Sequence, residues 1–150
     1  MIAGAHHAEQ RATRVLVSVA AVALVAIDVL YVGLVQSQGE SPFPLVTRFI
    51  TAFFAVVAAA LIGSLFTPPA VRLALRGVAS GGLVAMTVMA AMSIGAAVLV
   101  PAALCGAATA VTVARAPSTR NVVVAIVAVI AGAGVFLAGL QGAWSFYPNS

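Results

Sequence analysis

The sequence predicts an all-helical integral membrane protein, a bundle of transmembrane helices, from three observations. Apolar residues make up 63% of the chain and charged residues only 7%. A soluble globular domain carries roughly a quarter charged residues, so this surface has too few charges for water to dissolve it. The apolar residues also stand in runs of about 20 or more, the length that a helix needs to cross the hydrocarbon core. Because the runs are uniformly apolar and do not alternate as barrel strands do, they predict helices.

Charged residues divide the chain into four apolar blocks, three of which have the length of one span. Residues 15–36, 45–66 and 122–143 hold 22 residues each. Arg11 and Arg14 precede the first block, as in a secretory signal, but that block exceeds the roughly 7–15 apolar residues of a signal sequence. No small-residue cleavage motif follows it either. We therefore expect a retained span.

The remaining block, residues 77–114, holds 38 residues without a charge. As one helix it would be about 57 Å long against a core of about 30 Å, kinked at Pro101, and the chain would have four spans. As a hairpin turning near residues 93–97, it would give five. The positive-inside rule favours five, because the N-terminus and six of the seven arginines then lie on the cytoplasmic side.

Short segments with proline or polar residues join the spans. Residues 37–44 predict an external turn, and Pro68 with Pro69 ends the second span because proline cannot continue a helix. Residues 71–77 predict a brief interfacial helix with Arg72 and Arg76 on one side.

Aromatic residues close the last span. Trp144 and Tyr147, with Phe146, are expected to anchor the chain at a membrane–water boundary. The expected organisation is a cytoplasmic tail over residues 1–14, one helical bundle over residues 15–144 and a short tail over residues 145–150. Abundant Ala, Val and Gly, with no Lys, suggest a GC-rich bacterial genome. The expected location is thus a bacterial inner (plasma) membrane.

One acidic residue, Asp28, lies inside a predicted span, where ionisable residues are costly and often functional. Arg48 is its expected partner, since the two lie about 7 Å apart along the membrane normal in an antiparallel helix pair. Tyr31 and Thr51 could join the same intramembrane polar patch. The patch has a functional interpretation, an ion, proton or solute pathway, and a structural one, a pair that locks two helices or docks a partner. Arg48 could also extend to the interface alone.

No cofactor or metal site is expected from the remaining reactive side chains. Met86, Met89 and Met92 share one helix face but lack further soft ligands, so we interpret them as packing residues. His6 and His7 lie in the predicted tail without a third or fourth ligand, and Cys105 is expected to pack in an apolar run.

Small residues also recur every fourth position, which favours close helix packing in lipid. The stripes are Gly77, Gly81 and Ala85; Ala102, Gly106 and Ala110; Ala55, Ala59 and Gly63; and Gly134, Ala138 and Gly142.

These observations favour a membrane protein that is not an enzyme, because the short loops hold no nucleophile with a base and no phosphate loop. The leading hypothesis is an accessory or scaffold subunit, or a homo-oligomeric structural protein, whose partners are the bilayer and another membrane protein or a second copy. No nucleic acid is expected. The alternative is a small transporter or an ion or proton pathway that uses Asp28.

Overall fold

The computed structural model describes residues 2–39, 44–90, 95–115 and 117–146, with side chains described from Arg11 onward except at Gly95. Within these ranges the chain forms five helices and no strand: α1 (Ile2–Ser37), α2 (Pro44–Gly63), α3 (Pro69–Met89), α4 (Gly95–Arg115) and α5 (Thr119–Trp144). Each holds a stretch long and apolar enough to cross a membrane. The predicted helical membrane bundle, and the preference for five spans over four, are confirmed.

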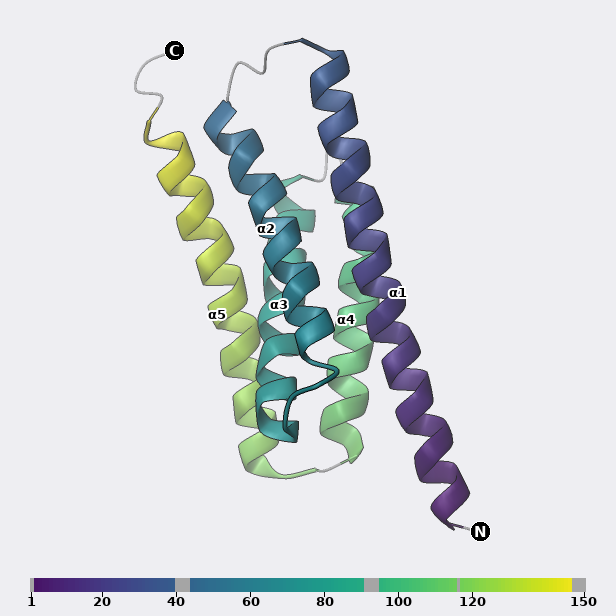
Figure 1. Cartoon of the computed structure of the whole chain (residues 1–150). Coiled ribbons are helices and arrows are strands. Elements are labelled where there is room, and N and C mark those ends of the chain that lie inside the picture. The colour runs from purple at the N-terminus through teal and green to yellow at the C-terminus, as the bar shows by residue number, and fades with distance from the viewer. Residues whose placement is uncertain (1, 40–43, 91–94, 116, 147–150) are drawn as a thin grey trace.

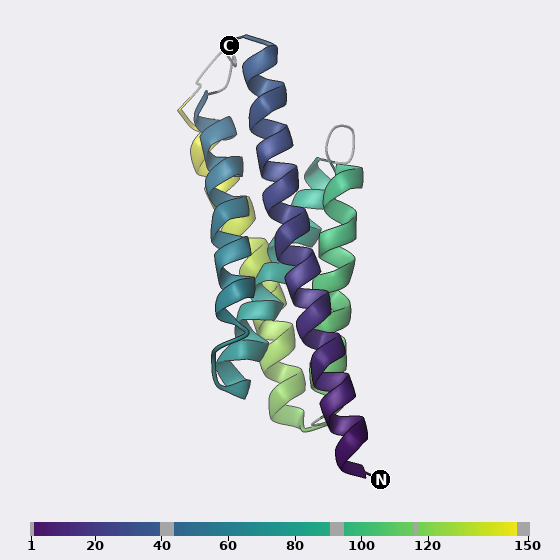
Figure 2. The same cartoon turned by 45° about the vertical axis from the view of Figure 1, so that its right-hand side comes forward.

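The helices run alternately up and down (Figure 1). Helix α3 is the centre of the bundle and contacts α2, α4 and α5, whereas α1 contacts only α2 and α4 among the described helices. Figure 2 shows α1 on the outer side of the bundle, with its first turns extending past the other helices. The connections between α2 and α3 and between α4 and α5 lie at the same end as the start of α1.

The core between the helices is apolar, and so is most of the outer surface. Leu24, Leu61 and Leu83 are fully buried, while Leu30 and Val88 are 72% and 71% exposed. Apolar side chains on both sides of a helix are expected where lipid surrounds the bundle.

Helices α3 and α5 approach so closely that glycine is required at the contact. A Cβ atom on Gly81 would collide with the backbone carbonyl of Val129, and one on Gly132 would collide with that of Val78. Gly77 also faces α5, against Ala128. The predicted stripe that begins at Gly77 and Gly81 therefore lies at a helix interface, as small residues do in lipid.

Not every predicted stripe is used within the chain. Gly134, Ala138 and Gly142 all face outward on α5, and a Cβ atom on Gly134 or Gly142 would meet nothing within 4 Å. This stripe does not contact another described helix.

Three aromatic rings join α2 to α5. The ring of Phe136 lies 5.9 Å from that of Phe49 and 4.9 Å from that of Phe53, between centroids. Gly139 and Gly82 leave room for the rings of Phe49 and Phe53 respectively. Tilted ring pairs at this spacing stabilise the contact beyond the apolar area that they bury.

The helices begin earlier than predicted at two places. Helix α1 starts at Ile2, because no strong helix breaker stands between Gly4 and the first span, so the predicted tail is helical. The predicted interfacial helix over residues 71–77 is wrong: these residues are the first turns of α3, which starts with Pro69 at its N-terminus and continues through Gly77. Glycine is tolerated at position 77 because it is buried against α5.

The hairpin in the long apolar block lies slightly before its predicted position. Helix α4 starts at Gly95, so residues 95–97 are helical, while residues 93–94 of the predicted turn lie outside the described residues. Pro101 lies within α4 and is buried.

Candidate anion-binding site

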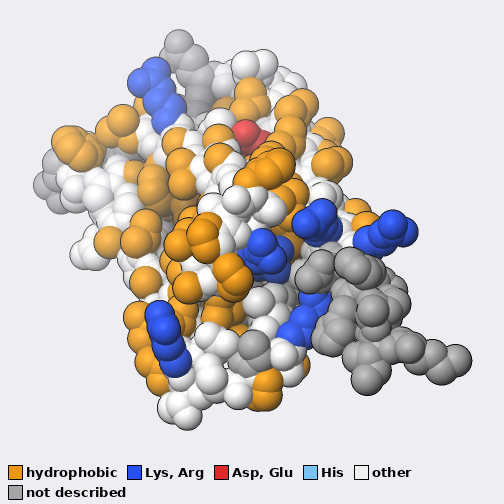
Figure 3. Space-filling model, turned by 60° about the horizontal axis from the view of Figure 1, so that its bottom comes forward, with side chains coloured by type: hydrophobic (Ala, Val, Ile, Leu, Met, Phe, Trp, Pro, Cys, Tyr) orange, Lys and Arg blue, Asp and Glu red, His pale blue; other side chains and the backbone are white. Residues whose placement is uncertain are grey.

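Arginines from four helices gather at one end of the bundle, which we call the arginine end. Arg14 comes from α1, Arg72 and Arg76 from the first turns of α3, Arg115 from the last turn of α4 and Arg120 from the first turn of α5. Figure 3 shows basic side chains around this face, with apolar side chains on the flanks of the bundle. The up-and-down topology causes the convergence, because these helix ends all lie on the same side.

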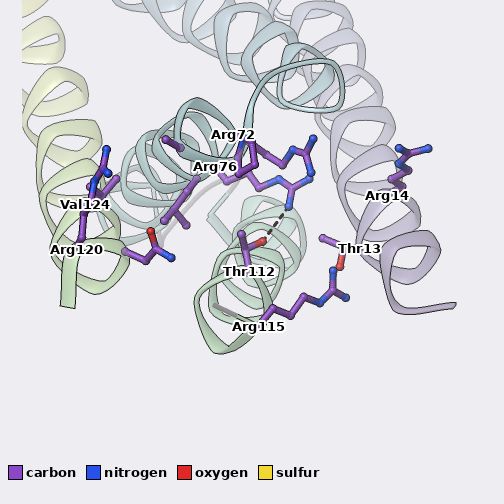
Figure 4. A pocket seen from close by; sticks show the side chains of 12 residues that line it. Thr13, Arg14, Arg72, Arg76, Thr112, Arg115, Arg120 and Val124 are labelled. Carbon is purple, nitrogen blue, oxygen red and sulfur yellow. Dashed lines mark hydrogen bonds between the residues drawn. The ribbon is translucent and has the colours of Figure 1, made fainter. Parts of the chain in front are cut away.

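The five arginines line one cavity of about 570 Å³, which we call the arginine cavity. In Figure 4, Arg72 and Arg76 extend from α3, and Arg115 reaches toward Thr13 of α1. Arg14 and Arg120 lie on opposite sides of this group. The volume falls within the range of ordinary small-molecule sites.

Arg76 is the buried member of the cluster, at 3% exposure. Its Nε donates to Ser64 Oγ at 3.3 Å, and its Nη1 donates to Thr112 Oγ1 at 3.0 Å. Both hydroxyls donate onward to carbonyls of their own helices, Ser64 to Leu61 and Thr112 to Ala108. The hydroxyls thus hold the guanidinium in place, and Arg76 links the end of α2 to α4.

Arg72 is held by carbonyl oxygens just after the end of α2. Its Nε donates to the Ser64 carbonyl at 3.2 Å, and its Nη2 donates to the Thr67 carbonyl at 2.9 Å. Both carbonyls lie in the connection between α2 and α3, and the fixed fork of guanidinium N–H donors lets one arginine bond to both.

The fixed arginines have no acidic counterpart in the described part of the chain. Arg72 and Arg76 bond to neutral oxygens, and no acidic side chain lines the cavity among the described residues. Within the part of the chain that the structure describes, these bonds use two of the five N–H groups of each guanidinium, and three stay available to a ligand. The charges of Arg72 and Arg115 also act on Arg76, which raises the cost of holding it buried. An anion in the cavity would offset that cost, and arginine forks match phosphate and carboxylate oxygens.

The predicted intramembrane patch is more dispersed than the arginine cavity. Asp28 is partly buried on α1, and its Oδ1 is buried without a hydrogen-bond partner among the described residues. Arg48 and Thr51 line a cleft of about 420 Å³ between α1 and α2, beside Gln36. Within the described chain, no hydrogen bond or ion pair joins Asp28 to Arg48.

The other residues singled out by sequence fall at scattered places. Tyr31 is half-buried on α1, and Trp144 is 45% exposed at the end of α5, away from the arginine end. Tyr147 lies outside the described residues, so its predicted anchoring stays a prediction. Cys105 is a buried free thiol. In the described part of the chain, no three His, Cys, Asp or Glu side chains lie together as metal ligands would.

Two of the remaining predictions also concern residues that are only partly covered. Met86 is buried and Met89 exposed, while Met92 lies outside the described residues. The side chains of His6 and His7 belong to the part of α1 for which only the backbone is described.

The arginine cavity was not predicted as a site. The arginines served only as topology signals, and Arg72 and Arg76 were placed on a surface helix. One signal for this site was present in the sequence. Apart from Arg48, the arginines form three pairs along the chain, and five spans bring all three pairs to the same end of the bundle. The four-residue spacing of Arg72 and Arg76, one helical turn, was a second signal.

Comparisons of this chain with protein-family models, curated protein sequences and solved structures find no match. The described residues define the class of the chain: a membrane protein with five helices in this part of the sequence and a basic cavity at one end of the bundle.

Proposed function

We propose that this protein is a non-catalytic membrane protein that binds a phosphate-type anion at its arginine end. The arginine cavity carries the proposal, because five guanidinium groups line it and the hydrogen bonds that fix Arg72 and Arg76 go to neutral oxygens. Arg72 and Arg76 are already fixed by neutral oxygens, so little side-chain freedom is lost when an anion binds.

A thermal unfolding assay in detergent tests this proposal. Pyrophosphate, compared with sodium chloride at matched ionic strength, raises the unfolding temperature of the wild type, because a ligand that binds only the folded state stabilises it. At ten times the dissociation constant, the stabilisation is about 1.4 kcal/mol. In Arg115→Gln the rise is smaller, while Arg11→Gln, which changes an exposed arginine of α1 outside the cavity lining, keeps it. Equal unfolding temperatures of the wild type in pyrophosphate and in sodium chloride would contradict the proposal.

We further propose that the chain works as an accessory or scaffold subunit, or as a homo-oligomer. The exposed stripe of Gly134, Ala138 and Gly142 on α5 supports this role, since the comparable Gly77 and Gly81 pack closely against a helix. Purification in nanodiscs should yield an oligomer or a co-purifying membrane protein. A strictly monomeric species without companions would argue against the role.

The proposed orientation places the arginine end on the cytoplasmic side of a bacterial plasma membrane. Its support is the clustering of basic residues at helix ends on one side, which is typical of cytoplasmic loops. The N-terminus then lies in the cytoplasm and the end of α5 outside.

A second candidate function is an ion or proton pathway that uses Asp28. It is favoured by the buried Oδ1 atom, which has no donor among the described residues, because a buried oxygen in that state is costly and needs a compensating role. Asp28→Asn should be compared with wild type for pH-dependent transport at matched membrane expression. Loss of flux with an intact assembly would support the pathway, whereas loss of folding or assembly alone would support a structural role for Asp28.

A further inference from the structure

The arginine cavity has an apolar side as well as a basic one. Leu73 and Val124 line it together with the arginines. Val71, two residues before Leu73, and Val123, beside Val124, are 48% and 51% exposed at the ends of α3 and α5. A ligand in the cavity therefore meets both guanidinium groups and apolar surface. A free inorganic anion would use only the first of these surfaces.

The position of the cavity relates it to the bilayer. It lies where four apolar helices end, and the helices extend from it through stretches long enough to cross the hydrocarbon core. This is the depth at which phospholipid headgroups meet the apolar interior. Basic sites between transmembrane helices at this depth are suited to anionic headgroups.

Size and charge also favour a ligand larger than a free phosphate ion. A volume of about 570 Å³ lies in the range that encloses drug-sized ligands. The five arginines belong to four helices, so a headgroup that contacts Arg76 can reach arginines on neighbouring helices as well. Each phosphodiester offers oxygens that accept paired N–H donors from a guanidinium.

From these observations we infer that the arginine cavity binds the phosphate headgroup of an anionic phospholipid, with the acyl chains lying on the apolar outer surface of the bundle. The inference rests on the proposed function, since it requires the cavity to bind an anion. It adds that the anion comes from the surrounding leaflet. The lipid would contact the ends of α1, α3, α4 and α5 together.

Native mass spectrometry of the full chain released from detergent tests the inference. The probes are the anionic lipids cardiolipin and phosphatidylglycerol and the zwitterionic lipid phosphatidylcholine, added separately at equal concentration. We expect the two anionic lipids to be retained in preference to phosphatidylcholine. Arg115→Gln should weaken that retention about fivefold. The double variant Arg14→Gln with Arg120→Gln, which removes the arginines on the two opposite sides of the cavity, should weaken it further.

Two single variants serve as matched controls. Arg11→Gln removes an exposed arginine one turn from Arg14, outside the cavity lining, and Arg48→Gln removes one from the opposite end. Both should retain anionic lipid as the wild type does. Each variant's unfolding temperature without added lipid shows whether it still folds, and Arg14, Arg115 and Arg120 are all exposed side chains.

The outcomes separate this inference from the proposed function. If pyrophosphate stabilises the chain but the lipids show no preference, the lipid inference is overturned and anion binding stands. If neither ligand binds, both fail. If Arg11→Gln lowers lipid retention as much as Arg115→Gln, general surface charge explains the retention, and the cavity is not the site.

Discussion

The guanidinium of Arg76 donates to the hydroxyl of Thr112 at 3.0 Å, across the contact between α3 and α4. Arg76 is almost fully buried, and the hydroxyl of Thr112 donates a hydrogen bond to the carbonyl of Ala108. This bond fixes a positive charge at the base of the arginine cavity with neutral partners only. The finding relates bundle packing to the basic site, because the same side chain serves both.

Replacing Thr112 with valine should destabilise the protein by about 1–3 kcal/mol, the usual cost of leaving a buried donor without its acceptor. The change keeps the shape of the side chain but leaves one N–H of Arg76 without its acceptor. Equilibrium unfolding in mixed detergent measures the effect. The matched control is Thr87→Val, whose hydroxyl bonds only to Leu83 of its own helix and should matter little. Equal stability of Thr112→Val and Thr87→Val would contradict this role of the Arg76 bond.

Gly81→Ala should destabilise the α3–α5 contact by about 1–3 kcal/mol, since the added methyl meets the Val129 backbone, which cannot move without shifting a helix. Gly33→Ala adds the same methyl to α1, where nothing lies within 4 Å. That control should be neutral or stabilise the helix by up to about 1 kcal/mol. The same unfolding assay compares the two. A neutral Gly81→Ala would show that the helices are not in close backbone contact.

Anion binding in the arginine cavity should weaken as salt is added, because the guanidinium charges are screened. Pyrophosphate titrations at increasing sodium chloride should give a rising dissociation constant in wild type and a shallower rise in the Arg14→Gln and Arg120→Gln double variant. Identical slopes for both proteins would mean that these two arginines do not face the bound anion.

The fold was largely predictable because lipid imposes a simple rule. Each apolar run of about 20 residues must become a helix, and the arginine pairs decided how the run over residues 77–114 is divided. The start of α3 was not predictable in the same way. Arg72 and Arg76 marked residues 71–77 as an interfacial segment, whereas tertiary partners, Ser64 and Thr112, allow Arg76 to enter the bundle.

The candidate site depended on contacts that span the sequence. Arg76 and Thr112 are 36 residues apart, and Arg14 lies farther still from Arg120. Only the packing order of the helices brings them together, and spacing along the chain does not give that order. Asp28 was recognisable alone as a charge in an apolar run, but the residue expected opposite it, Arg48, lines a separate cleft.

The topology of the chain tests the account most directly, because the arginine cavity exists only if five spans bring its arginines to one side. In a Cys105→Ala background, single cysteines at Ala12, Thr119 and Gln38, all exposed, are labelled in intact cells with a membrane-impermeant maleimide. The account predicts that positions 12 and 119 share one side and position 38 lies on the other. If positions 119 and 38 are labelled alike and position 12 differs, the account is contradicted. The arginines would then lie on both sides of the membrane.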